Sequence, residues 1–152
     1  LYILAMIVFG LVNFTANFAQ AASLTDTAWQ FRLGEQTKDA QAAALCAQSV
    51  YSDPKAWETF SYPSRPPVEN DTGYIWLTTT LPDVHYGNPV LFFTTLEESV
   101  RVYLDDVLLY QYGDMEYKRY SYGMKWHIVE LPDGYEGRHL TFQLYTSHPG
   151  RL

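Results

Sequence analysis

The sequence predicts an all-β protein, an antiparallel β-sandwich with one short helix. Short segments in which apolar and polar residues alternate recur along the chain, about eight in all, with Pro, Gly, Asn or Asp between them. Thirteen tyrosines and an aromatic content of 16% also suit strands better than helices. The third observation is the segment 99–113, where a period of two continues on both sides of Asp105 and Asp106. This pattern is typical of a β-hairpin.

A two-residue turn at Asp105 and Asp106 would set the register of this hairpin. Asp106 is expected at a positive φ, because Asp tolerates that conformation better than most residues. The expected cross-strand pairs are Leu104 with Val107, Val102 with Leu109, and Val100 with Gln111. The predicted core face carries Val100, Val102, Leu104, Val107 and Leu109, and the opposite face carries Arg101, Tyr103, Leu108 and Tyr110.

The remaining elements follow from the same alternation and from residue preferences. An Ala-rich segment, 38–50, favours the single helix, with Ala42, Leu45 and Cys46 on one face. The loop 62–72 contains three prolines and is too short for an interdomain linker, so one domain is expected. The other predicted strands are 29–33, 57–60, 73–81, 89–95, 125–131 and 138–146.

Residues 1–22 carry no charge, and 1–12 form an apolar run of signal-peptide length. Ala19, Ala21 and Ala22 supply small residues for cleavage. The sequence therefore predicts a signal peptide at 1–22, followed by an exported domain at 23–152. No Met and no basic residue precede the run, so we expect the leader to be truncated at its start. An uncleaved membrane anchor and a buried core helix remain alternatives.

Charge and cysteine content restrict the partners and the cross-links. A formal net charge of −7 argues against nucleic acid and against anionic membrane surfaces as partners. Cys46 is the single cysteine, which excludes an intrachain disulfide. It is expected to be a small buried hydrophobic residue.

Signatures of catalysis are missing from the sequence. It has no Gly-rich phosphate loop, no HExxH and no GxSxG motif. Asp105 and Asp106 are adjacent, as are Glu97 and Glu98, and adjacent residues in a strand point to opposite faces. We therefore expect no enzymatic activity from this domain, and neither a metal nor a cofactor, although calcium at an Asp-rich loop stays open. None of the four histidines pairs at metal-ligand spacing; they are His85, His127, His139 and His148.

The segment 112–126 is the candidate ligand-binding region. It mixes tyrosines and a tryptophan with charges of both signs, and sugars bind through aromatic faces together with polar groups. The alternative is that these aromatic residues belong to the core or cover a sheet edge, as is expected of Trp57 and Trp76. The loop 62–72 is the second candidate region. The predicted ligand-binding residues are Tyr112, Asp114, Tyr117, Arg119, Tyr120, Lys125 and Trp126.

Several motifs occur in a fixed order along the chain: Trp29-x-Phe31, Trp57 before the proline loop, Gly73-Tyr74-x-Trp76, Leu81-Pro82, Val100-x-Val102-Tyr103-Leu104-Asp105 with Gly113, and Leu131-Pro132 before the strand 140–145. Over roughly residues 27–148, their order resembles that of a known family. The domain resembles the galactose-binding-like jelly roll, as in the sugar-binding domain of family 2 glycoside hydrolases. It is still more similar to the extracytoplasmic sensory domain of bacterial seven-transmembrane receptors. One departure is Asp106, where the sugar-hydrolase relatives usually have Gly.

The resemblance implies a non-enzymatic ligand-sensing domain on the periplasmic or extracellular side of the cytoplasmic membrane. Such a domain binds a small molecule, among which carbohydrates are candidates, or a periplasmic protein. It passes the signal to a membrane region that is missing here and to a diguanylate cyclase or histidine kinase. A homodimer is a further partner that the resemblance leaves open. The alternative is a non-catalytic carbohydrate-binding domain of a secreted glycoside hydrolase.

Overall fold

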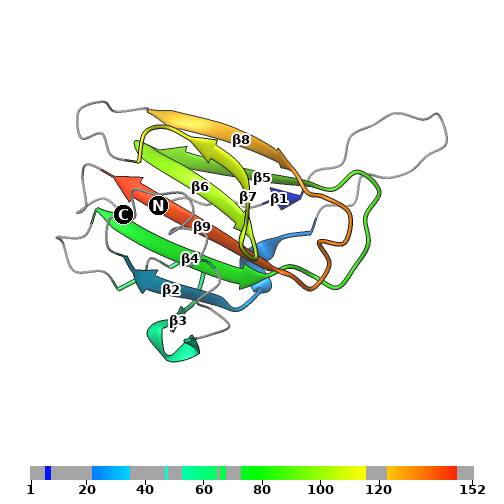
Figure 1. The fold of residues 1–152 in the computed structure, drawn as a ribbon, viewed down its shortest axis with the longest axis horizontal. Helices are drawn as coiled ribbons and strands as arrows, with labels where there is room; N and C mark the ends of the chain where they lie inside the picture. Colours follow the sequence, from blue (N-terminus) through cyan, green and yellow to red (C-terminus); the bar gives the residue numbers. More distant parts are fainter. Residues whose placement is uncertain are drawn as a thin grey trace.

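In the part of the chain that the structure describes, nine antiparallel strands form two sheets that pack against each other (Figure 1). The structure, a computed structural model, describes residues 6–7, 22–34, 47, 53–64, 66–67, 73–115 and 123–146. The larger sheet has six strands in the order β3-β2-β4-β9-β6-β7, and the smaller has three in the order β1-β5-β8. The predicted antiparallel β-sandwich is therefore confirmed.

The observed strands agree closely with the predicted ones, and each predicted end lies within one residue of the observed end outside the hairpin. The larger sheet consists of β3 (Glu58–Phe60), β2 (Trp29–Leu33), β4 (Tyr74–Thr80), β9 (His139–Thr146), β6 (Glu98–Leu104) and β7 (Val107–Tyr112). The smaller sheet consists of β1 (Met6–Ile7), β5 (Val90–Leu96) and β8 (Met124–Glu130). Two 3-10 turns are η1 (Leu24–Asp26) and η2 (Pro54–Ala56).

Two predicted segments fall mostly outside the described residues. Of the predicted helix at 38–50, the structure describes Ala47, which is helical and fully buried. Of the predicted leader at 1–22, it describes Ala22 and the two residues of β1, which pair with Leu91 and Phe92 of β5. The signal peptide remains a prediction.

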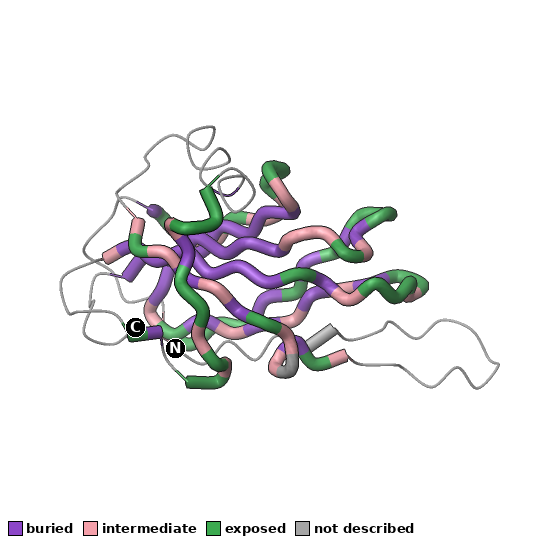
Figure 2. Tube along the Cα trace, turned by 90° about the horizontal axis from the view of Figure 1, so that it is seen from below, coloured by how far each residue is buried: buried purple, intermediate pink, exposed green. Residues whose placement is uncertain are grey.

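The main core fills the space between the two sheets. Alternation places one face of each strand here, so Ile75 and Leu77 of β4 meet Leu91 and Phe93 of β5 in a single cluster, with Phe142 of β9 among them. The ring centroids of Phe93 and Phe142 lie 5.2 Å apart in an edge-to-face contact. Figure 2 shows the buried middle of the strands and the exposed loop tips at the right-hand end of the sandwich.

The outer face of the larger sheet is also buried. Trp76 lies between Ile75 and Leu77 in sequence, so it points away from the main core, and it packs with Trp57, Tyr103 and Ala47. A further cluster on this sheet consists of Tyr74, Tyr145 and Met115. Trp57 and Trp76 are thus buried, as expected. Strands β4, β6 and β9 are consequently buried on both faces along most of their length.

The hairpin between β6 and β7 forms, but its predicted register is wrong beyond the pair of Tyr103 with Leu108. Leu104 faces Val107 as expected, whereas Val102 faces Tyr110. Leu109 is the extra residue, because Tyr103 pairs with Leu108 and the next pair is Val102 with Tyr110. The bulge turns Tyr110 and Tyr112 toward the core, so the prediction that Tyr110 lies on the opposite face is wrong. Val107 keeps its predicted pair beside the turn but is 52% exposed, so the predicted core face is also wrong at Val107.

The turn also uses the other aspartate. Asp105, and not Asp106, has a positive φ of 52°. Its carboxylate accepts hydrogen bonds from Arg138 Nε at 2.6 Å and from the backbone N–H of His139 at 3.1 Å. The Asp105 N–H in turn donates to the His139 carbonyl at 2.8 Å. These bonds join the turn to the start of β9, which explains why Asp105 takes the strained conformation.

Substitution of Asp105 by Ala is expected to lower the free energy of unfolding by about 1–3 kcal/mol, because a charge-assisted pair and a backbone acceptor are lost. Asp106→Ala is the matched control, since Asp106 is exposed and should cost less than about 0.5 kcal/mol. Urea unfolding of both variants measures the difference. Equal losses in the two variants would contradict this role of Asp105.

Gly34 follows β2 and lies against the indole of Trp76. A Cβ at position 34 would lie 2.4 Å from Trp76 Nε1, and Trp76 is only 1% exposed and has little room to move. Gly34→Ala is therefore expected to destabilise the fold by about 1–3 kcal/mol through overpacking. Gly87→Ala is the control, because nothing lies within 4 Å of its added Cβ. Thermal unfolding that is unchanged in Gly34→Ala would refute the close packing.

Candidate functional site

The structure divides the seven predicted ligand-binding residues between different locations. Tyr117, Arg119 and Tyr120 lie outside the described residues. The other four are described, and they belong to the end of β7, the turn after it and the start of β8. Lys125 and Trp126 are neighbours in β8 and therefore point to opposite faces of the smaller sheet. The four described residues are Tyr112, Asp114, Lys125 and Trp126.

Asp114 lies in the turn after β7, near the outer face of the larger sheet. Its side chain is exposed, and its backbone carbonyl accepts a hydrogen bond from Ser99 Oγ at 2.8 Å. Burial raises the pKa of the Tyr145 hydroxyl, and the negative charge of Asp114 raises it further. Asp114 is thus close to Tyr145 of the larger sheet, away from the aromatic residues of β8.

Tyr112 points between the two sheets, where it surrounds a buried histidine together with Tyr110. The ring of Tyr112 meets His127 edge to face with centroids 4.9 Å apart. His127 is 2% exposed and stacks on Phe93 with centroids 4.7 Å apart. Tyr112 is half-buried and packs against the main core, so it is a structural residue at this position.

Both ring nitrogens of His127 have hydrogen-bond partners. Nε2 lies 2.9 Å from Thr95 Oγ1, and Nδ1 lies 3.0 Å from the Tyr110 hydroxyl. Burial lowers the pKa of His127, and the positive charge of Lys125 lowers it further. The histidine is therefore neutral at pH 7 and serves as a polar link between β5, β7 and β8. Its partners hold both nitrogens, which makes it a poor metal ligand or general base.

Trp126 lies on the other side of β8, on the outer face of the smaller sheet. Its ring stacks on Phe92 of β5 with centroids 5.2 Å apart and an interplanar angle of 30°. Thr94 is directly opposite Trp126 in the strand register. Three other apolar side chains share this face because they alternate with inward-pointing residues. We call this the β5–β8 outer face; it consists of Phe92, Leu96, Met124, Trp126 and Ile128.

The β5–β8 outer face is strongly exposed. Trp126 is 62% exposed, Ile128 67%, Met124 62% and Leu96 53%. Single apolar residues at a surface are common, but these four, together with half-buried Phe92, surround Thr94 on two paired strands and form a patch. The sequence 124–130 indicates this exposed face, because apolar residues occur on both faces of the strand: Met124, Trp126 and Ile128 on one, and Val129 on the other.

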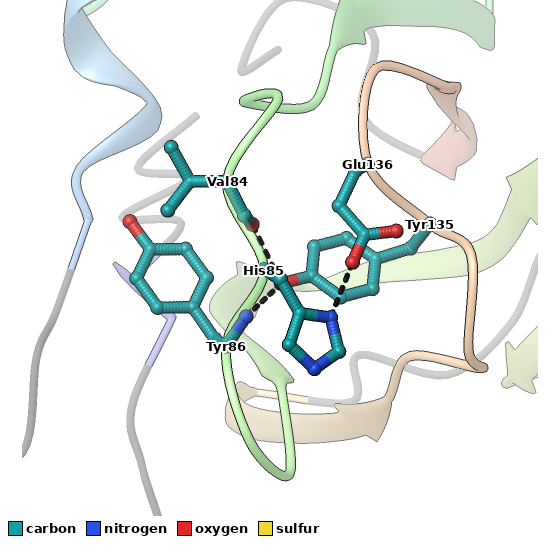
Figure 3. A network of polar contacts seen from close by, with 5 residues as sticks. All are labelled: Val84, His85, Tyr86, Tyr135 and Glu136. Atoms are coloured by element: carbon teal, nitrogen blue, oxygen red, sulfur yellow. Dashed lines mark hydrogen bonds and ion pairs between the residues drawn. The ribbon is translucent and has the colours of Figure 1, made fainter.

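At one end of the smaller sheet, two loops are joined by a tyrosine and an ion pair (Figure 3). The Tyr135 hydroxyl donates to the Val84 carbonyl at 2.9 Å and accepts from the Tyr86 N–H at 2.8 Å. His85 Nδ1 lies 2.5 Å from Glu136 Oε1, and this contact lowers the pKa of the Glu136 carboxyl. One loop precedes β5 and the other follows β8, so these contacts hold the ends of both strands together.

No family model matches this chain, and neither does any curated protein or any solved structure. Within the described residues, no helix is long and apolar enough to cross a membrane. The same part of the chain contains no group of three or more His, Cys, Asp or Glu side chains arranged to hold a metal ion. The β5–β8 outer face is thus the best candidate site that includes a predicted ligand-binding residue.

The buried histidine predicts how stability depends on pH. Because folding lowers the pKa of His127, the unfolded chain binds more protons once the pH falls below the ordinary value of 6.5. The free energy of unfolding should therefore decrease from about pH 7 to about pH 5, until folded His127 also becomes protonated. Urea titrations across this range measure the slope.

His127→Gln should reduce this slope, because it removes one of the two described histidines whose pKa is lowered by burial. The other is His139, whose pKa is lowered by burial and partly restored by Asp105. The double variant with His139→Gln should show the flattest profile. A slope that is the same in His127→Gln and in the original chain would contradict the assignment.

Proposed function

We propose that this domain is the extracytoplasmic ligand-sensing domain of a bacterial membrane signalling receptor, and that it binds its ligand on the β5–β8 outer face without catalysis. The observation that carries the proposal is the contiguous exposure of Trp126, Ile128 and Met124 on one face of a sheet. Exposed apolar patches of this kind mark interaction sites in soluble domains. The family resemblance of the sequence supports the receptor role.

The chemistry of this face suits a ligand that has both an apolar surface and hydroxyl groups. Phe92 fixes the orientation of the Trp126 ring by stacking, which reduces the entropy lost on binding. The apolar C–H face of a sugar ring packs against such an indole, and the Thr94 hydroxyl lies opposite in the register. An apolar patch on a periplasmic protein would be complementary to the same face.

Transmission of a signal requires that the ligand bind two states of the domain with different affinity. The position of β8 provides a physical route, because Trp126 on its outer face is followed directly by His127 on its inner face. A displacement of β8 would therefore alter the contacts of His127 with Thr95 and Tyr110. The membrane region of the receptor would read the resulting change in the domain.

The second candidate function is a non-catalytic carbohydrate-binding domain of a secreted glycoside hydrolase. The exposed, flat ring of Trp126 stacked on Phe92 favours this function, because such a ring suits one unit of a polysaccharide. The two functions differ in the ligand. A hydrolase module retains insoluble or polymeric glycans, whereas a sensory domain binds soluble small molecules or a protein.

Substitution of Trp126 by Ala tests the proposed face. Binding of soluble oligosaccharides is measured by calorimetry and binding of polysaccharides by affinity electrophoresis. Loss of the aromatic contact should weaken binding roughly 2- to 12-fold, which corresponds to about 0.5–1.5 kcal/mol. Because Trp126 is 62% exposed, the free energy of unfolding should change by less than about 1 kcal/mol.

Val107→Ala is the matched control, since Val107 is also apolar and is 52% exposed, but lies on β7 of the larger sheet. It should leave binding unchanged. Equal affinity of Trp126→Ala and the original chain for an identified ligand would refute the β5–β8 outer face as the site. A large loss of stability in Trp126→Ala would instead identify this residue as part of the core.

A further inference from the structure

Arg101 is a buried arginine on the outer face of the larger sheet. It lies in the middle of β6 between Val100 and Val102, both of which point into the main core, so its own side chain points the other way. The residue is only 6% exposed. Arginine is rarely buried to this extent unless an opposite charge accompanies it.

The partners of Arg101 are neutral amides. Nε donates to Gln111 Oε1 at 2.9 Å, and Nη1 donates to Gln143 Oε1 at 3.3 Å. These residues are its direct neighbours on both sides, because Arg101 pairs with Gln111 of β7 and with Gln143 of β9. A guanidinium has five N–H donors, so most of its donors remain unused by these two bonds.

No carboxylate among the described residues pairs with Arg101. Arg138 provides the contrast within the same protein: its side chain is 32% exposed, yet it forms an ion pair with Asp105 at 2.6 Å. The more exposed arginine thus has a carboxylate partner, whereas the buried one has none within the part of the chain that the structure describes. A buried charge without a counter-charge is costly, and a neutral apolar residue would fill the same place at lower cost.

Aromatic clusters flank Arg101 along the sheet. Tyr103, two residues further along β6, packs with Trp76 on one side. Tyr145, two residues beyond Gln143 on β9, packs with Met115 on the other side. Gln111 lies on the edge strand β7 and is exposed, so the row from Gln143 through Arg101 to Gln111 runs from the interior of the sheet to solvent.

We propose that Arg101, together with Gln111 and Gln143, binds the carboxylate group of a small ligand on the outer face of the larger sheet. The planar guanidinium matches a carboxylate through two parallel hydrogen bonds, and a bound carboxylate supplies the missing counter-charge. Gln111 directs its oxygen to Arg101, which leaves its Nε2 amide as a further donor at the exposed end of the row. This site is on the other sheet from the β5–β8 outer face, and it stands or fails independently of the proposed function.

The test is the midpoint of thermal unfolding of the 152-residue chain in sodium acetate, sodium glucuronate and sodium phosphate, compared with sodium chloride at equal ionic strength. Glucose serves as the uncharged counterpart of glucuronate. At a hundredfold excess over its Kd, a carboxylate should raise the midpoint by roughly 5–10 °C, whereas chloride and glucose should not. The effect of phosphate should be weaker than that of the carboxylates.

Arg101→Met should abolish the shift caused by carboxylates while the midpoint in chloride stays equal or rises, since a buried charge has been removed. Lys55→Met is the matched control: it removes an exposed cation elsewhere, in η2, and should retain the full shift. Gln111→Ala, at an exposed position, should reduce the shift with the fold intact and serves as the test if Arg101→Met does not fold.

Three results would overturn the proposal. The first is the absence of any carboxylate-dependent shift in the original chain, and the second is a shift that persists in Arg101→Met or is unaffected in Gln111→Ala. The third is a shift in phosphate that exceeds the shift in carboxylates, which would assign the site to another class of anion.

Discussion

The fold depends on the burial of both faces of the larger sheet. In most antiparallel sandwiches one face of each sheet meets the core and the other meets water. Here β4, β6 and β9 are buried on both sides, with Ile75 and Leu77 facing the smaller sheet and Trp76 facing outward into a second cluster. This constraint explains why Gly34 must lack a side chain and why Arg101 is enclosed. It also leaves the smaller sheet as the layer with a free apolar face.

The strands could be predicted from the sequence because their alternation is local. A period of two around Ile75 or Phe142 reports directly which residues face a core, and tertiary contacts have only to agree with it. The ends of the strands could also be predicted, since Pro or Gly occurs within three residues after most of them. The burial of the outer face of the larger sheet was harder to predict. Alternation shows that Trp76 and Arg101 point away from the main core, but not whether their face meets water.

The hairpin shows where local patterns are insufficient. The extra residue at Leu109 arises because Tyr110 and Tyr112 gain contacts with His127, which lies on a strand of the other sheet. Asp105 takes the positive φ because Arg138 and His139 bind its carboxylate, and both are more than 30 residues away in sequence. For the candidate site, the sequence identified Trp126 but grouped it with Tyr112. Alternation within β8 places Trp126 on the face opposite to His127, and this could have been predicted from 124–130 alone. The contact of Tyr112 with His127 could not, because it depends on the bulge in β7.

The place of β9 in the larger sheet bears on how the chain folds. β9 is the last described strand in sequence, but it lies between β4 and β6 in the sheet. It therefore joins the three strands β3, β2 and β4 to the hairpin of β6 and β7. Its register partners in β4 are separated from it by roughly 60 to 70 positions along the chain, as in the pair Thr78 with Thr141. During synthesis, β4 and β6 therefore each have one edge without a partner strand until residues 139–146 have been synthesised. The larger sheet can be completed only after its last described strand has been synthesised, and unpaired strand edges of this kind are prone to aggregation until then.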